Sequence, residues 1–347
     1  MPQLPSGRPT ISDVAARAGI SKGMVSLALR GAPGPSAETT ARVLRAAEEL
    51  GYRPDRAASS LALRRTRLLG VTMTVRNAFH AELVEELQSA AEDAGYDLVL
   101  APVTRTRGER AAVETLLDSR CEALLLLGPE AATEELRGWD ARTPTVVFGC
   151  RPRTGPDGGA GGGPDVVRAS EAVGLRLVVE HLAALGHREL VHVSGGSGDI
   201  AADRRAAFEA AAAERGVGAR TVEAGFDEEA GVLATQRLLT AQGPPTAVVA
   251  ANDRVALGVL DTLLRAGVQV PQQVSVTGYD DSQLARLGHV RLTSVGQDPA
   301  GQARAAVRLA LERLEDVEHA GGRDVLVEPH LVVRDTTAPP RGEFMSQ

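Results

Sequence analysis

The stretch that decides the fold of the first part of this chain is TISDVAARAGISKGMVSLALR, residues 10–30. Its pattern predicts two short helices joined by a tight turn at Gly19. Thr10 and Asp13 can cap the first helix reciprocally, and Ser21 can cap the second. Such a pair is either an ordinary helical hairpin or a helix-turn-helix, whose second helix lies in the major groove of DNA. The apolar residues expected to face inward are Val14, Ala15, Ala18, Val25, Ala28 and Leu29.

The distribution of charge favours the DNA-binding interpretation. Residues 1–67 carry 11 Lys and Arg against 5 Asp and Glu, a balance of +6. The remaining residues carry a balance of −13, which gives the whole chain its net charge of −7. A basic head on an acidic body is typical of a nucleic-acid-binding module attached to another domain.

Length and composition limit the classes of protein. With 347 residues, of which 43% are hydrophobic and 24% charged, the chain can form two or three globular domains. It has no apolar run long enough to span a membrane and no apolar signal core, so we expect a cytoplasmic protein with no membrane partner. Cys121 and Cys150 are expected to be buried thiols, because two cysteines are too few for a disulfide framework. We find no metal-ligand spacing and no catalytic pair, and we expect neither metal nor cofactor.

Two further elements follow the helix pair. Ser36 can cap a third helix that ends at Gly51. Asp55 can cap a short helix over residues 55–63, which is followed by an arginine-rich segment that ends at residue 67. A helix of about eight residues is marginal in water by itself. Residues 55–67 are therefore either a hinge that folds on DNA, with phosphate contacts from its arginines, or a plain linker. The apolar positions of the third helix are Val43, Leu44, Ala47 and Leu50.

From residue 68 to 278, buried strands alternate with amphipathic helices, which is typical of parallel sheets covered on both faces. About ten strands in two series predict an α/β fold of two doubly wound lobes, with a Gly- and Pro-rich surface insertion at 154–164. The strands expected from the pattern are 68–73, 97–101, 123–127, 145–149, 190–194, 221–224, 247–250 and 274–278. The helices expected from it are 81–94, 109–119, 171–185, 201–215, 228–241 and 254–266.

Polar side chains follow several of these strands. Ligands of doubly wound sheets bind at the carboxyl ends of the strands, and Asn77, Arg204, Asn252 and Asp280 stand at or just beyond such ends. These residue types suit a polyol or another polar small molecule held between two lobes.

Several motifs in the chain resemble the lactose/galactose-repressor family of transcription regulators. The resemblance runs from Thr10 to about Pro340 and includes the ending LVVRDTTAPP at 331–340. It implies a helix-turn-helix head and a two-lobed, periplasmic-binding-protein-like domain. It also implies a homodimeric repressor whose affinity for a palindromic operator is set by a small, sugar-like effector in the cleft. The motifs are DVAxxAGIS (13–21), LGYRP (50–54), RTRxLGV (65–71), EHLxxLGHR (180–188), ANDxxALG (251–258), GYDD (278–281) and LTSVxQ (292–297).

The resemblance also implies which residues contact DNA. Lys22 and Gly23 match base-reading positions, whereas Ser21 and Ser26 match phosphate contacts. Leu27 stands where the family often has Arg; leucine cannot make the bidentate contact of Arg to guanine, although it can touch a thymine methyl group. The leucine that wedges into the minor groove in the family corresponds to Leu61 of the hinge. The complete expected set is Thr10, Ser21, Lys22, Gly23, Ser26, Leu27, Arg30, Ala58 and Leu61.

For the effector cleft, the resemblance implies an aromatic pair, an arginine, a stacking aromatic, an amide and a carboxylate. Cys150 stands where an acidic residue is frequent, and Ala169 and Ser170 replace an acidic pair near the interlobe crossing. The pocket is therefore expected to be less acidic than in many sugar-binding relatives. By itself, His80 is more typical of a structural or exposed residue, and we assign His187 to the fold. The expected contacts are Phe79, His80, Arg204, Phe226, Asn252 and Asp280.

The expected domains are a helix-turn-helix head (1–54), a hinge (55–67), an effector-binding and dimerisation domain (68–340) and a tail (341–347). Lobe 1 is expected over about 68–168 and 297–323, and lobe 2 over about 169–296 and 324–340. The tail is too short for the leucine heptads of tetrameric family members, which predicts a dimer.

Two other classes of function fit parts of the chain. A two-lobed core also serves solute-binding proteins of transport systems, but those need a secretion signal in place of a basic head. Residues 196–201, GSGDIA, fit a loose dinucleotide-binding fingerprint. The acid expected at the end of the next strand is at best Glu223. We therefore expect that the protein is not an enzyme.

Overall fold

The computed structural model describes residues 9–30, 32–52, 65–149, 162–241, 244–315 and 321–340. The chain divides into two compact units, Met1–Thr66 and Arg67–Gln347. Each unit has its own hydrophobic core. The mixed α/β architecture predicted from the sequence is confirmed, with a helical head followed by two sheets.

The described residues of the first unit form the helices α1 (Ile11–Ala18), α2 (Lys22–Leu29) and α3 (Ala37–Leu50). The Asp13 carboxylate accepts hydrogen bonds from both the N–H and the hydroxyl of Thr10, each at 2.7 Å. The Ser21 hydroxyl accepts the N–H of Met24 at 3.3 Å and so caps α2. Gly19 has a φ of 65°, a left-handed conformation that glycine adopts at no steric cost. The predicted caps and turn are therefore confirmed.

The core of this unit is made by one apolar face of each helix. Val14, Val25 and Val43 are completely buried. The expectation that Leu44 belongs to this core is wrong, because its side chain is 52% exposed. Ala46, three residues after Val43, turns inward in its place.

In the second unit, the residues that the structure describes form two six-stranded sheets. Their strand orders are β11-β5-β4-β3-β1-β2 and β12-β10-β9-β8-β6-β7. Neighbouring strands are parallel except for β10 and β12, which are antiparallel. The strands of the first sheet are β1 (Leu68–Thr74), β2 (Asp97–Val103), β3 (Ala123–Leu127), β4 (Thr145–Phe148), β5 (Asp165–Ala169) and β11 (Asp324–Val327). Those of the second are β6 (Glu189–Ser194), β7 (Gly218–Glu223), β8 (Ala247–Ala250), β9 (Ser275–Asp280), β10 (Thr293–Gly296) and β12 (His330–Val332).

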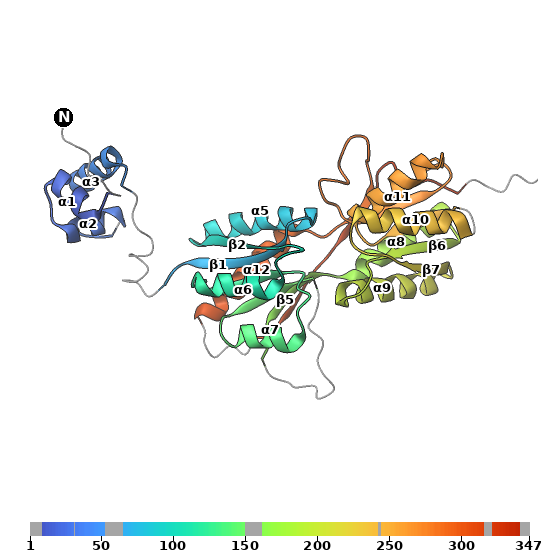
Figure 1. Ribbon diagram of the computed structural model, residues 1–347, viewed down its shortest axis with the longest axis horizontal. Coiled ribbons are helices and arrows are strands. Elements are labelled where there is room, and N and C mark those ends of the chain that lie inside the picture. The colour runs from blue at the N-terminus through green and yellow to red at the C-terminus, as the bar shows by residue number, and fades with distance from the viewer. Residues whose placement is uncertain are drawn as a thin grey trace, which may run out of the picture. The chain divides into compact units, whose positions relative to one another are not determined.

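Helices cover both faces of each sheet, as Figure 1 shows. In the first lobe, α5 and α12 pack on one face, and α6 and α7 pack on the other. In the second lobe, α10 and α11 face α8 and α9 across the sheet. Central strands such as β3 are buried on both faces, as covered parallel sheets require. The helices are α5 (Ala78–Asp93), α6 (Glu109–Asp118), α7 (Thr133–Asp140), α8 (Glu171–Leu185), α9 (Asp199–Arg215), α10 (Glu228–Ala241), α11 (Asp253–Arg265) and α12 (Pro299–Glu315).

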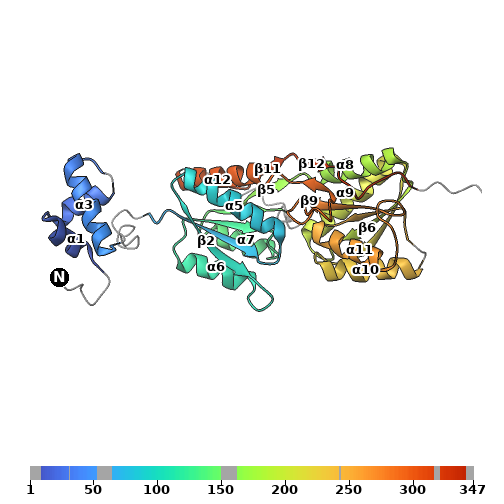
Figure 2. The ribbon, with the colours of Figure 1, turned by 90° about the horizontal axis from the view of Figure 1, so that it is seen from above.

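The chain crosses between the lobes where β5 leads into α8, where β10 leads into α12 and where β11 leads into β12. The boundary expected between residues 323 and 324 is wrong, because β11 pairs in parallel with β5. Figure 2 shows β11 beside β5 in the first lobe and β12 in the second. The last crossing therefore follows Val327.

Two glycines allow α10 and α11 to approach closely. A Cβ atom at Gly258 would lie 2.0 Å from the carbonyl oxygen of Glu228. One at Gly231 would lie 2.3 Å from the carbonyl oxygen of Val255. Both obstacles are backbone atoms, so neither position has room for a larger residue.

Two smaller expectations concern the cysteines and the membrane. Cys121 is buried, as predicted, and burial raises the pKa of its thiol to about 11. Cys150 lies outside the described residues. Within the part of the chain that the structure describes, no helix combines the length and the apolar character that a membrane span needs.

Candidate functional site

The exposed N-terminal end of α2 carries the residues expected to read bases. Lys22 and Gly23 are exposed, whereas Ser26 and Leu27 are half-buried. Ser21 and Thr10 are exposed, and each is also engaged in a helix cap. At the other end of α2, Arg30 donates from Nε to the carbonyl of Ser26 at 3.0 Å. Ala58 and Leu61 lie outside the described residues, so the hinge helix stays a prediction.

A cavity of about 590 Å³ lies between the two lobes of the second unit. Its lining includes Glu171, Arg254, Gln297 and Asn77, the last of which stands at the end of a predicted strand. All six residues expected to contact an effector also line this cavity, although they come from five separate parts of the sequence: Phe79, His80, Arg204, Phe226, Asn252 and Asp280.

The lobe 1 side of the cavity is built at the start of α5. The Asn77 side chain accepts the N–H groups of Phe79 and His80, at 3.0 and 3.4 Å, and so starts the helix three residues before the predicted position. His80 is buried, and its Nδ1 accepts the N–H of Thr74 at 3.1 Å. Burial lowers the pKa of His80 to about 4. The ring is therefore neutral at pH 7 and carries its proton on Nε2.

On the lobe 2 side, Arg204 is enclosed by protein groups. Its Nε and Nη2 donate to the two carboxylate oxygens of Glu171 at 3.0 and 2.9 Å. Its Nη1 donates to the carbonyl oxygen of Ala251. The guanidinium also lies 3.8 Å from the centroid of the Tyr279 ring, in cation–π geometry. Arg204 is therefore a buried residue and not a solvated surface arginine, since it is only 5% exposed.

Phe226 and Asn252 are held against each other. The side-chain amide of Asn252 donates to the carbonyl oxygen of Phe226 at 3.1 Å. Its oxygen accepts the N–H of Val255 at 2.9 Å and caps α11. A Cβ at Gly195 would lie 2.1 Å from the Phe226 ring, so the ring packs directly on this glycine. One amide hydrogen of Asn252 is left over for another acceptor.

Asp280 ends β9 with a φ of 107°, an uncommon conformation for a residue other than glycine. One of its carboxylate oxygens accepts from Nε2 of Gln297 at 2.7 Å. The side-chain amide of Gln302 donates in turn to the backbone carbonyl oxygen of Gln297 at 2.7 Å. Burial raises the pKa of Asp280 well above its ordinary value, although the nearby Arg204 opposes this.

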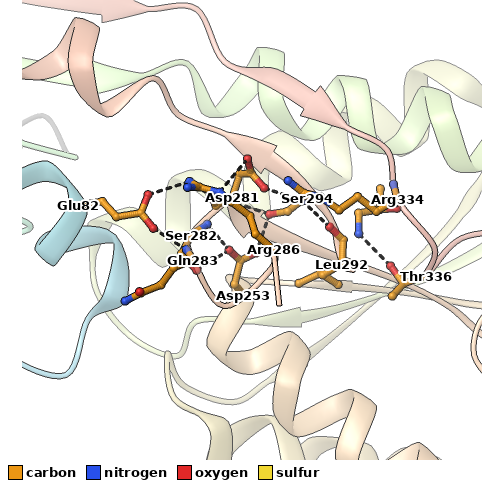
Figure 3. Close-up of polar contacts among 11 residues, drawn as sticks. Glu82, Asp253, Asp281, Ser282, Gln283, Arg286, Leu292, Ser294, Arg334 and Thr336 are labelled. Carbon is orange, nitrogen blue, oxygen red and sulfur yellow. Dashed lines mark hydrogen bonds and ion pairs between the residues drawn. The ribbon is translucent and has the colours of Figure 1, made fainter. Parts of the chain in front are cut away.

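A polar network fixes the segment that follows Asp280, as Figure 3 shows. Asp253 accepts from the N–H and hydroxyl of Ser282, at 2.7 and 2.8 Å, and from the Ser294 hydroxyl at 2.6 Å. Asp281 pairs with Arg334 at 2.6 Å. These bonds hold both ends of the loop that joins β9 to β10. They therefore fix the position of the loop where it faces lobe 1.

The loop bonds to Glu82 of lobe 1, and we term these bonds the interlobe contact. Glu82 of α5 accepts the backbone N–H of Gln283 and pairs with Arg286 at 2.8 Å. Figure 3 shows this carboxylate between the two donors. Glu82 lies two residues after His80, and Gln283 lies three residues after Asp280, so the contact adjoins the cavity on both lobes.

Some features of the site were not predicted. Glu171, directly after Ser170, lines the cavity and accepts from Arg204, a carboxylate that was not among the expected contacts. The sequence could have indicated Glu171 by its position, because it is the first residue of a predicted helix that follows a crossing between the lobes. His187 is a fold residue, as predicted, since it is 1% exposed and contacts Thr246 and Ser275. Residues 197–201 of the loose dinucleotide fingerprint line the cavity, whereas Glu223 pairs with Arg205 at 3.1 Å.

Comparisons with known proteins agree with this architecture. Residues 10–55 match the model of bacterial regulatory proteins of the lacI family, and residues 179–337 match a periplasmic binding protein-like domain. The chain is 30% identical over 339 residues to the HTH-type transcriptional repressor PurR of Vibrio vulnificus (strain CMCP6), which covers 94% of this chain and 98% of the relative.

Two solved structures extend the comparison. A Lac repressor dimer bound to operator and the anti-inducer ONPF is 27% identical, with a TM-score of 0.81 and coverage of 96% of this chain and 100% of that one. A complex of the transcriptional regulator CelR with cellobiose is 29% identical, with a TM-score of 0.69 and coverage of 95% and 100%. This chain therefore belongs to the lacI family of bacterial transcription regulators, with a helix-turn-helix head and a periplasmic-binding-protein-like domain.

Proposed function

We propose that the protein is a repressor that binds a palindromic operator as a homodimer in the cytoplasm, and that a sugar-like molecule bound between its lobes sets its operator affinity. The observation that carries the proposal is the single cavity that gathers Phe79 and His80 from one lobe and Arg204, Asn252 and Asp280 from the other. A ligand that touches both lobes stabilises one arrangement of them over another. Such differential binding is what an allosteric effector needs.

Each side chain has a chemical role in this proposal. Phe226 offers a flat apolar face on which a sugar ring can stack. The free amide hydrogen of Asn252 and the second carboxylate oxygen of Asp280 can bond hydroxyl groups. On the head, Lys22 contacts a base and Ser26 contacts a phosphate, while the hinge leucine, Leu61, enters the minor groove. The solved structure of a Lac repressor dimer bound to operator supports a dimer on DNA.

A thermal-shift screen with sugars, nucleosides and amino acids tests the effector class. A ligand at 100 times its Kd stabilises the native state by about 2.7 kcal/mol, which raises the melting midpoint visibly. Asp280→Asn should remove the shift produced by the hit and leave operator binding without effector unchanged. Asp261→Asn is a matched control, because that exposed residue of α11 pairs with Arg265 one turn along the same helix and is not among the residues that line the cavity. A hit whose shift survives Asp280→Asn would contradict the assignment of the site.

A further inference from the structure

We propose that Glu171 makes the effector pocket selective for uncharged polyhydroxyl ligands, by occupying the guanidinium that would otherwise bind a phosphate or carboxylate. The inference rests on the proposed function and concerns the same cavity. It names a specificity-determining residue that the sequence motifs do not contain.

The first support is the geometry of Arg204. A free guanidinium binds a carboxylate or phosphate through two parallel N–H groups. In this pocket the Nε–Nη2 edge of Arg204 is already used by the two oxygens of Glu171. Both side chains are buried, with 6% and 8% of their surfaces exposed. A ligand anion would have to displace a carboxylate that is itself buried, and the displaced charge would lose its partner.

The second support is that the other arginine of the lining is also paired. Among the cavity-lining residues that the structure describes, the lysine and arginine side chains are those of Arg204 and Arg254. Arg254 donates from Nε to Glu228 at 2.8 Å and makes a second bond to the other oxygen of that carboxylate. His80 adds no positive charge, since burial lowers its pKa to about 4.

The third support is the charge of the wall. Four carboxyl groups line the cavity, those of Glu130, Glu171, Asp199 and Asp280, against the two arginines. Because burial raises the pKa of Asp280, the charge balance is drawn without it, and the other three carboxylates still outnumber the two arginines. Carboxylates accept hydrogen bonds from hydroxyl groups and repel anions, and side-chain amides both accept hydrogen bonds from hydroxyl groups and donate to them. The lining can therefore form hydrogen bonds with the hydroxyl groups of a ligand, and its side chains carry a net negative charge.

The experiment compares neutral sugars with their phosphorylated forms. Isothermal titration calorimetry on the full-length protein would use D-glucose with D-glucose 6-phosphate, D-ribose with D-ribose 5-phosphate, and adenosine with adenosine monophosphate. We expect the wild type to bind the neutral member of the pair it recognises at least about tenfold more tightly than the anionic member. Equal or tighter binding of the anionic member overturns the inference and needs no variant.

Glu171→Gln then tests the residue itself. Glutamine keeps the shape and one acceptor but removes the charge, so the preference for the neutral member should fall by about tenfold. Glu180→Gln is the matched control, because Glu180 lies on the same helix and pairs with Arg215 outside the cavity. An unchanged preference in a folded Glu171→Gln protein overturns the inference, as does the absence of binding by every neutral probe. If adenosine binds and the sugars do not, the proposal of a sugar-like effector fails. The preference for an uncharged ligand is then tested by adenosine against adenosine monophosphate.

Discussion

The buried side chain of His80 should make the folded protein less stable in mild acid. In the unfolded chain its imidazole titrates near 6.5, whereas in the folded protein burial lowers this pKa to about 4. The neutral ring is therefore favoured by folding, and its contribution is complete above pH 6.5. As the pH falls from 6.5 towards 4, the unfolded chain gains a proton that the folded chain resists. The free energy of unfolding should then fall by about 3 kcal/mol from this residue.

His80→Asn isolates that contribution. The asparagine oxygen can still accept the N–H of Thr74, but it does not titrate. Because His192 is also buried, with its pKa lowered to about 4, the wild type and the variant share its contribution, which cancels in their difference. The exposed His289, changed to Asn, serves as the control.

Urea unfolding followed by the fluorescence of Trp139 provides the assay. Trp139 is the single tryptophan of the chain and is buried in lobe 1, the lobe that contains His80. Between pH 6.5 and 4, the unfolding free energy of the wild type should fall by about 3 kcal/mol more than that of His80→Asn. A constant difference over this range would refute the assignment of His80 as a buried, neutral residue.

Three further predictions concern the head, the interlobe contact and the core of lobe 2. Lys22→Ala should cost about 1–3 kcal/mol of discrimination between operator variants in fluorescence anisotropy; a uniform loss over all sequences would make Lys22 a phosphate contact. Glu82→Gln should weaken the interlobe contact by about 0.5–1 kcal/mol and broaden the distribution of lobe-to-lobe distances between spin labels, whereas Glu85→Gln on the exposed side of α5 should not. Equal distributions in both variants would show that the contact does not hold the lobes. Gly258→Ala should destabilise the protein by about 1–3 kcal/mol or more in thermal unfolding, because its Cβ would meet backbone atoms; Gly138→Ala, which meets nothing within 4 Å, is the control.

Local patterns in the sequence carry much of the fold. Thr10, Asp13, Ser21 and Gly19 predict the head because caps and turns depend on neighbouring residues. The strands and helices between residues 68 and 278 follow from runs of buried residues of the expected length. The pattern fails for β5, which borders the Gly-rich insertion, and for β10, β11 and β12, which are short. It also leaves out α12 and gives no firm position for α7.

The site divides in the same way. Its six expected contact residues could be predicted, because the resemblance to the family assigns each of them by its own position in the sequence. Glu171 could not, since its role depends on Arg204, 33 residues away. The interlobe contact joins Glu82 to Arg286 over 204 residues. The partners in such pairs are brought together by the folding of the lobes, so a local sequence pattern cannot predict them.

The central claim is that one small molecule in the cavity controls operator affinity. The most direct measurement is a fluorescence anisotropy titration of an operator selected from random inverted repeats, with and without the ligand found by the thermal-shift screen. We expect the ligand to change the operator Kd by about 5–150-fold, which corresponds to a coupling free energy of about 1–3 kcal/mol. An operator Kd that stays the same while calorimetry reports a saturated effector site would contradict it.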